Sequence, residues 1–314
     1  MRRLAALPLL LGLVVLPAEA ATTYPLTLQN CGFAVTFDKA PQRVVTIKST
    51  ATELLLSLGL RDRIVGVGFQ DGPLPADLAA AGAGLKVLSE KAPSQEVVLE
   101  TEPDFVYGGW ESNFAGDAAG ERPSLKQLGV ASYVSPPACR SIRPPKLTFD
   151  AVFAEIGEMG AIFDVAPAAA ALVAKQKAML AAVRRDARGL TAVWYSSGTK
   201  APYVGAGSGA PAMIMEALGL RNVFAGVDDG WTSANWEAVV DANPDVIVLV
   251  DAAWNSAEQK RKLLAANPIT GKLDAVVNQR YLVIPFPASE AGVRNVPAAV
   301  DMARQLGALQ IPAK

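Results

Sequence analysis

The sequence predicts an α/β protein made of two similar lobes, each built on a parallel β-sheet, and three observations support this fold class. An internal repeat places Leu-Gly-Leu-Arg followed by Gly-Val at 58–67 and again at 218–227. Short apolar runs alternate with helical stretches, which is typical of strands crossing to parallel neighbours. A helix-rich segment, residues 148–188, separates the two copies. A cleft between two such lobes is a natural ligand site.

Residues 1–20 have the layout of a secretory signal peptide. Arg2 and Arg3 precede an apolar run over 4–16, and small residues flank Glu19 before the expected cleavage point. About 13 apolar residues are too few to span a bilayer, which needs about 20. The next cysteine is Cys31, so we expect a mature protein in the periplasm without a lipid anchor.

The two lobes are expected over residues 21–147 and 189–314. Apolar β-branched runs predict their strands, and Ala- and Leu-rich stretches predict their helices. In the first lobe we expect strands at 43–47, 64–67 and 105–107 and helices at 51–58 and from 96; in the second, strands at 191–195, 246–250 and 281–284 and a helix at 212–218. Ligands of such sheets bind beyond the carboxyl ends of the strands.

The segment 148–188 is predicted to be a rigid helical connector between the lobes. Asp150 can cap its first part, and Pro167 suits the first turn of its second part. From Pro167 to Arg188, a continuous helix would be roughly 33 Å long. A coiled-coil partner helix is the alternative, but sustained heptads are missing.

Composition excludes several functions. After removal of residues 1–20 the formal charge is −2, so there is no basic excess for nucleic acid or an anionic membrane. The chain has no histidine, which excludes Ser-His-Asp catalysis and His-ligated metal or haem. The two cysteines, Cys31 and Cys139, are either joined in a disulfide, as an oxidising compartment favours, or remain buried thiols.

Candidate ligand-binding residues are aromatic and cationic residues at or just beyond expected strand ends. The aromatic rings have core packing as their alternative role, and the cations have ordinary surface charge. The candidates are Lys48, Ser49, Phe69, Lys91, Trp110, Tyr195, Trp231, Trp254 and Arg294. The Gly-x-Gly-x-x-Ala motif at 205–210 lacks the buried strand that a dinucleotide site requires, so we interpret it as a helix start whose N–H groups could hold an anion.

Glu96 and Glu237 occupy the same position in the two copies. Each stands seven residues before a Pro-Asp pair and an apolar strand, in the first turn of an expected helix. A helix start favours Glu for structural reasons alone. Two glutamates at the same spacing, one in each lobe, would however also give two acidic side chains able to pair with basic residues of a partner.

These motifs in this order resemble the substrate-binding proteins of iron-siderophore and cobalamin ABC importers. The resemblance rests on 41–45, 51–53, 58–60 and the two Glu…Pro-Asp units, and it covers roughly residues 24–310. It implies two Rossmann-like lobes joined by a long α-helix, with Glu96 and Glu237 pairing with arginines of the permease dimer. Four further segments, 89–94, 109–114, 194–198 and 290–295, resemble a subgroup labelled as binding a deazaflavin coenzyme precursor.

We therefore expect a monomeric periplasmic solute-binding protein that performs no chemistry and holds no cofactor or metal of its own. Its ligand would be a bulky metal chelate or cofactor-like molecule: a ferric siderophore, a corrinoid or a deazaflavin precursor. An anionic, ring-bearing molecule would fit the tryptophans together with Lys48, Lys91 and Arg294. The alternatives are a carboxylate-based periplasmic enzyme using Glu90, Glu111, Asp251 or Glu290, and a structural adaptor without a ligand.

Overall fold

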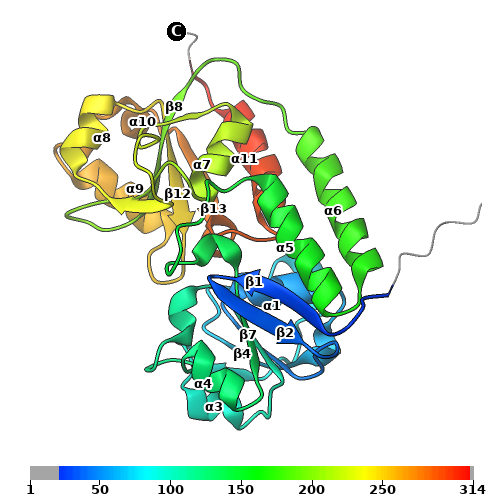
Figure 1. Ribbon diagram of the computed structural model, residues 1–314. Coiled ribbons are helices and arrows are strands. Elements are labelled where there is room, and N and C mark those ends of the chain that lie inside the picture. The colour runs from blue at the N-terminus through cyan, green and yellow to red at the C-terminus, as the bar shows by residue number, and fades with distance from the viewer. Residues whose placement is uncertain (1–20, 312–314) are drawn as a thin grey trace, which may run out of the picture.

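The computed structural model describes residues 21–311 and has the expected two-lobe α/β architecture (Figure 1). The predicted signal peptide, residues 1–20, lies outside the described residues. A β-hairpin, β1 (Leu26–Asn30) and β2 (Phe33–Phe37), packs against the first lobe. Within residues 21–311, no helix is both long enough and apolar enough to cross a membrane.

The N-terminal lobe contains a parallel sheet that has five strands within the described residues, in the order β5-β4-β3-β6-β7. Its strands are β3 (Val44–Ile47), β4 (Ile64–Gly68), β5 (Val87–Ser89), β6 (Phe105–Gly108) and β7 (Ala131–Val134). Its helices are α1 (Ser49–Ser57), α2 (Ala76–Ala79), α3 (Gln95–Leu99) and α4 (Arg122–Gln127). All residues of β3 are buried, as expected for the central strand of a covered sheet.

The C-terminal lobe contains a mixed sheet in the order β11-β9-β8-β12-β13, with β10 also paired to β8. Its strands are β8 (Thr191–Ser197), β9 (Tyr203–Gly205), β10 (Arg221–Asn222), β11 (Trp231–Ser233), β12 (Val246–Asp251) and β13 (Tyr281–Pro285). Its helices are α7 (Ala210–Leu218), α8 (Trp236–Ala242), α9 (Ala257–Ala266), α10 (Asp274–Val277) and α11 (Asn295–Ala308). Strand β9 is antiparallel to both of its neighbours, β8 and β11. Its direction relative to β8 follows from the short link between them, which allows only a hairpin.

The helix end in the first half of the sequence repeat has the same structure in both lobes. Gly59 and Gly219 end α1 and α7 with φ of +76° and +78°, a left-handed conformation that favours glycine. The second half differs, because Gly66-Val67 belongs to β4 whereas 226–227 lies in a loop. That loop packs against the chain before α7, where the Gly207 N–H donates to the Val227 carbonyl over 2.9 Å.

The two Pro-Asp pairs also have equivalent positions. Asp104 accepts hydrogen bonds from the backbone N–H groups of Gln42 and Arg43, just before β3. Asp245 accepts hydrogen bonds from the N–H and hydroxyl groups of Thr191, the first residue of β8. In each lobe this carboxylate ties the start of the central strand to its neighbour.

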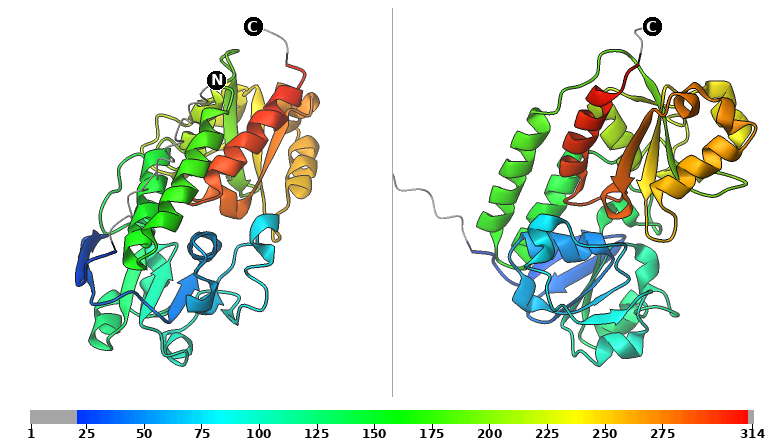
Figure 2. Two further views of the ribbon diagram at one scale, coloured as in Figure 1. Left: turned by 90° about the vertical axis from the view of Figure 1, so that its right-hand side faces the viewer. Right: turned by 180° about the vertical axis from the view of Figure 1, so that it is seen from behind.

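The connector consists of two antiparallel helices rather than one helix reaching Arg188. Helix α5 spans Phe149–Ile162 and α6 spans Ala166–Ala181, and α6 rises beside α11 toward the second lobe (Figure 2). Asp164, with φ of +56°, ends the first helix. The second ends at Ala181, and beyond it the Asp186 N–H donates to the Leu218 carbonyl over 2.8 Å, which joins the chain to the C-terminal lobe. The cap of α5 is Thr148, with Asp150 in the first turn.

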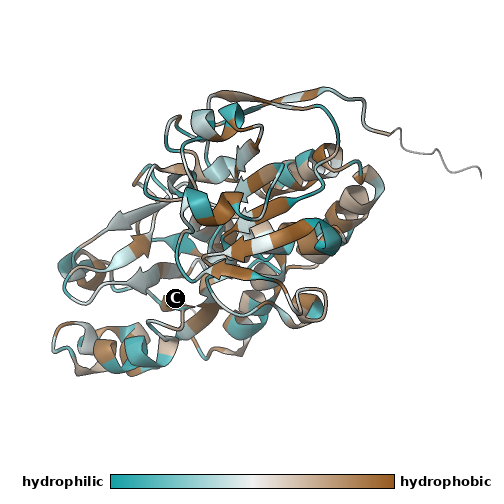
Figure 3. Cartoon of the chain, turned by 90° about the horizontal axis from the view of Figure 1, so that it is seen from below, coloured by the Kyte–Doolittle hydropathy of each residue, from teal (hydrophilic) through white to brown (hydrophobic). Residues whose placement is uncertain are grey.

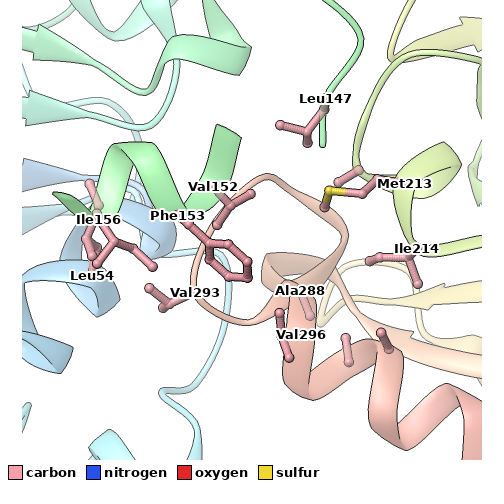
Figure 4. Close-up of a cluster of buried hydrophobic side chains, with 14 of the residues drawn as sticks. Leu54, Leu147, Val152, Phe153, Ile156, Met213, Ile214, Ala288, Val293 and Val296 are labelled. Carbon is pink, nitrogen blue, oxygen red and sulfur yellow. The ribbon is translucent and has the colours of Figure 1, made fainter. Parts of the chain in front are cut away.

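One hydrophobic core extends through both lobes, and α5 lies at its centre. Val152 and Phe153 of α5 face Val293 and Ala288, and Ile156 lies beside Leu54 of α1 (Figure 4). Ala288 lies in the short 3-10 helix after β13, and Val293 lies in the loop before α11. Seen from below, apolar strands occupy the middle of the molecule and polar residues are concentrated on the outer helices and loops (Figure 3). The lobes are therefore packed together as well as linked.

Replacing Asp104 or Asp245 with Ala should destabilise the protein. Each change leaves backbone donors at the start of a central strand without their carboxylate, which costs about 1.5 kcal/mol or more. Urea denaturation would measure the loss in the free energy of unfolding. Asp38→Ala, at an exposed position after β2, is the control and should have little effect. Equal effects of all three changes would contradict a specific role for the Pro-Asp pairs.

Glu155 of α5 makes stability depend on pH. Its carboxyl accepts hydrogen bonds from the hydroxyls of Tyr107 (2.7 Å) and Ser135 (3.1 Å), and burial raises its pKa from 4.5 to about 7. Since the folded pKa lies above the unfolded one, this group's stabilising effect is lost as pH rises from about 4.5 to 7, by about 3 kcal/mol. Glu155→Gln should remove this loss when urea denaturation is compared at pH 5 and pH 8. An unchanged difference between the two pH values would contradict the assignment.

Candidate functional site

A cavity of about 750 Å³ lies between the lobes. Its walls include residues that end or directly follow five strands, β6 and β7 of the first lobe and β8, β12 and β13 of the second. These are the carboxyl ends at which ligands of parallel sheets are expected. The volume lies within the range of small-molecule binding sites, about 300–1,000 Å³.

Aromatic rings form much of the cavity wall. Trp110, Trp231 and Trp254, all expected from the sequence, line it. Tyr203 and Phe286, which were not expected from the sequence, line it as well. The Tyr203 ring stacks on the Trp231 ring with their centres 5.8 Å apart. The Phe286 ring packs edge-on against the Trp254 ring with their centres 5.0 Å apart. Phe286 directly follows β13, so its position beyond an expected strand end was a signal that could have identified it. Tyr203 is the first residue of β9, a strand that was not expected from the sequence.

Trp110 is held on two sides. Its indole N–H donates to a Glu290 carboxylate oxygen over 2.9 Å, joining the N-terminal lobe to the C-terminal lobe. The Lys48 ammonium lies 3.4 Å from the centre of the Trp110 ring and also pairs with Asp71. Burial lowers the pKa of Lys48 and raises that of Glu290, while the opposite charges nearby counteract both shifts. The ring is thus fixed before any ligand arrives.

Three more expected ligand residues support this arrangement instead of lining the cavity. Lys48 is almost fully buried, so its charge is used by Asp71 and the Trp110 ring. The Phe69 ring packs edge-on against the Trp110 ring with their centres 5.6 Å apart. Ser49 is buried, and its hydroxyl accepts a hydrogen bond from the Asp71 N–H.

The remaining three expected residues also lie outside the cavity wall. Arg294 forms a two-point ion pair with the buried carboxylate of Glu53, at 2.5 and 2.6 Å, which links the two lobes a second time. The Tyr195 hydroxyl donates to the Gly198 carbonyl, and its ring packs against Trp236 inside the C-terminal lobe. Lys91 is exposed on the N-terminal lobe and does not line the cavity.

A strap formed by residues 139–147 borders the cavity and connects both lobes, and sequence reasoning missed it. On the first lobe, Cys139 is joined by a disulfide to Cys31, and the Glu111 carboxylate accepts the N–H groups of Arg140 and Ser141. No periodic pattern marked this segment, and the two cysteines were its only local signal.

The other side of the strap is bound to the second lobe. Three ion pairs join them: Arg140–Asp229 at 3.4 Å, Arg143–Asp228 at 2.6 Å and Lys146–Glu216 at 2.8 Å, and all three are largely exposed. The Leu147 N–H donates to the Ser208 carbonyl over 2.7 Å. Exposed ion pairs contribute little stability, so this is the more easily broken side.

The Gly-rich segment 205–210 serves packing. A Cβ on Gly207 would lie 2.3 Å from the Ala225 carbonyl oxygen, so glycine is needed for the close approach of the two loops. The N–H groups of Gly207 and Ser208 donate to the carbonyls of Val227 and Asp229. The N–H groups of Gly207 and Ser208 are therefore used within the loop, whereas Gly209 and Ala210, at the start of α7, line the cavity.

Glu96 and Glu237 hold the same local position in the two lobes. Each is the second residue of its helix, α3 or α8, after a capping residue, Ser94 or Asn235, whose side chain accepts a helix N–H. Both glutamate side chains are exposed. Among the described residues, no group of three or more acidic or cysteine side chains is arranged to hold a metal ion.

Residues 44–288, which include both sheets and most of the cavity wall, match the model of one protein family, described as periplasmic binding protein. The chain belongs to this family. The members are binding proteins rather than enzymes, so the carboxylate-enzyme alternative is not supported. Membership also indicates a location outside the cytoplasm and a role as a substrate-binding protein, which requires a permease and a small ligand.

Known proteins similar to this chain agree with that placement. An uncharacterized ABC transporter substrate-binding lipoprotein of Bacillus subtilis is 23% identical over 92% of this chain and 87% of its own length. A cobalamin-binding protein of Halobacterium salinarum is 27% identical over 74% of this chain, which spans only 60% of that relative. A periplasmic binding protein structure from Veillonella parvula has a TM-score of 0.81 at 28% identity, covering 91% of this chain and 98% of that one.

Proposed function

We propose that this periplasmic binding protein captures a bulky, ring-bearing metal chelate or cofactor-like molecule between its lobes and delivers it to an ABC permease. The observation that carries the proposal is the cavity of about 750 Å³ walled by Trp110, Trp231, Trp254, Tyr203 and Phe286. Aromatic faces bury large areas of a ring system and stack on it without needing precise hydrogen bonds.

Three ligand classes fit this description. A corrinoid is supported by the cobalamin-binding relative. A ferric siderophore is supported by a structure from Saccharomonospora viridis titled as an ABC-type Fe3+-hydroxamate transport system, with 26% identity and a TM-score of 0.79 over 91% of this chain and 100% of that one. A deazaflavin precursor is supported by the four segments that resemble that subgroup, one of which contains Trp110 and another Glu290.

We further propose that Glu96 and Glu237 dock the protein on arginines of a permease dimer. The support is their exposure and their equivalent position in two equivalent helices. We also expect the protein to act as a monomer without lipid on Cys31. The Bacillus subtilis relative is a lipoprotein, but here the sulfur of Cys31 is bonded to Cys139.

A thermal-shift panel with cyanocobalamin, ferrioxamine B and a 5-deazaflavin tests the ligand proposal. A ligand at 100 times its Kd should add about 2.7 kcal/mol of stability. Trp231→Ala should weaken binding of the active compound about tenfold through lost stacking. Phe33→Ala, a surface ring on the β-hairpin outside the cavity, is the control. If no compound stabilises the protein, or if both variants weaken binding equally, the proposal fails.

Replacing Glu96 and Glu237 together with Ala should abolish uptake by cells carrying the cognate permease while leaving ligand affinity within about twofold, since the cavity is untouched. Uptake of labelled ligand and direct titration measure the two quantities. The matched controls are Glu100→Ala and Asp241→Ala, exposed acids directly after α3 and within α8. A collapse of affinity in the double variant would place these residues in the site or in the fold instead.

A further inference from the structure

We infer that the cavity selects a ligand bearing a positive charge, and that Glu290 is the residue that recognises this charge. The inference rests on the proposed function and deepens it by naming the ligand's charge. It differs from the sequence-based expectation of an anionic ligand, which depended on Lys48, Lys91 and Arg294. None of those three cations is part of the cavity wall.

The ionisable residues that do form the wall have an acidic excess. Within the described residues they are four carboxylates and two guanidinium groups: Glu111, Asp228, Asp229, Glu290, Arg140 and Arg143. Both arginines are already paired with Asp228 and Asp229 across the strap. Two carboxylates, those of Glu111 and Glu290, therefore remain to determine the charge that the cavity presents to a ligand.

These two carboxylates differ in what already binds them. One oxygen of Glu111 receives the backbone N–H groups of Arg140 and Ser141, so this carboxylate is used to hold the strap. Glu290 is half-buried in the wall, and its Oε2 receives the Trp110 indole N–H. The Lys48 ammonium near Glu290 is already occupied by Asp71. A cation in the cavity would complete the pairing of Glu290, whose half-buried carboxylate is less screened by solvent than an exposed one.

The aromatic walls favour the same charge. The faces of Trp and Tyr rings attract cations, by roughly 0.5–2 kcal/mol each depending on exposure. The protein itself demonstrates this contact, since the Lys48 ammonium lies over Trp110 at 3.4 Å and over Phe69 at 4.2 Å. Trp231, Trp254 and Tyr203 offer further aromatic surface to the cavity. A negative charge on the ligand would gain nothing from these faces and would be repelled by Glu290.

Two probes that differ in one charge test the inference. Ferrioxamine B is a ferric trihydroxamate with a free ammonium group, and its N-acetyl derivative lacks that positive charge. Titration of the intact mature protein should show at least tenfold tighter binding of ferrioxamine B than of the acetylated complex. Equal affinities, or tighter binding of the acetylated complex, would overturn the inference.

The variant Glu290→Gln distinguishes recognition of the ligand's positive charge from positioning of the Trp110 ring. The amide oxygen of Gln can still accept the Trp110 N–H, while the negative charge is lost. If Glu290 recognises the cation, this variant should bind ferrioxamine B at least tenfold more weakly and the acetylated complex unchanged. Trp110→Phe should keep the preference between the two probes, because the carboxylate remains. Glu100→Gln, outside the cavity, is the control.

The opposite pattern would overturn the inference. If Glu290 only positions Trp110, then Glu290→Gln will keep the preference and Trp110→Phe will reduce the affinity for both probes. If neither ferrioxamine complex binds while cyanocobalamin or the deazaflavin does, the inference fails and the proposed function stands. If no compound of the panel binds, both fail. Thermal unfolding of each variant, compared with the parent protein, shows whether a lost affinity reflects lost folding.

Discussion

The hydrophobic core shared by the two lobes is the constraint on which the rest of the structure depends. Phe153 and its neighbours on α5 fill the space between the N-terminal lobe and the loop after β13, so neither lobe buries its apolar surface alone. Two polar links between the lobes, Glu53–Arg294 and Trp110–Glu290, are built on this packing. Because cores transmit strain rather than yield to it, the width of the cavity is largely fixed by these contacts.

The buried ion pair beneath Trp110 is better understood as a positioning device than as a source of stability. Removing Lys48 and Asp71 from water costs several kcal/mol, which their attraction only partly offsets. What the pair achieves is geometric: an ammonium held under the indole ring, and an indole N–H aimed at Glu290. A binding wall that is rigid before the ligand arrives loses less conformational entropy on binding. The free energy spent on burying the Lys48–Asp71 pair thus serves to hold the cavity wall ready for a ligand.

The sequence predicted the fold better than the site, for a physical reason. Caps, glycine turns and strand patterns are local, so the two lobes, Gly59 and Gly219, and the first-turn positions of Glu96 and Glu237 could be predicted. Whether a charge is free depends on distant partners. Arg294 is paired with Glu53, 241 positions away, and no local pattern contains that information. The strap was missed because non-repetitive segments are positioned by tertiary contacts alone.

The two lobes are alike at their outer features and differ at the cavity wall, which supports different roles for these two regions. The glycine helix ends, the Pro-Asp ties and the exposed glutamates are alike in both lobes. The cavity wall is unlike: Trp110 and the strap come from one side, and the β9–β11 pair and the loop after β13 come from the other. In the proposed docking, a permease dimer would present two equivalent surfaces and favour two equivalent contacts, whereas a small ligand without symmetry would not. Selection on binding would therefore change the cavity and leave the outer glutamates in place.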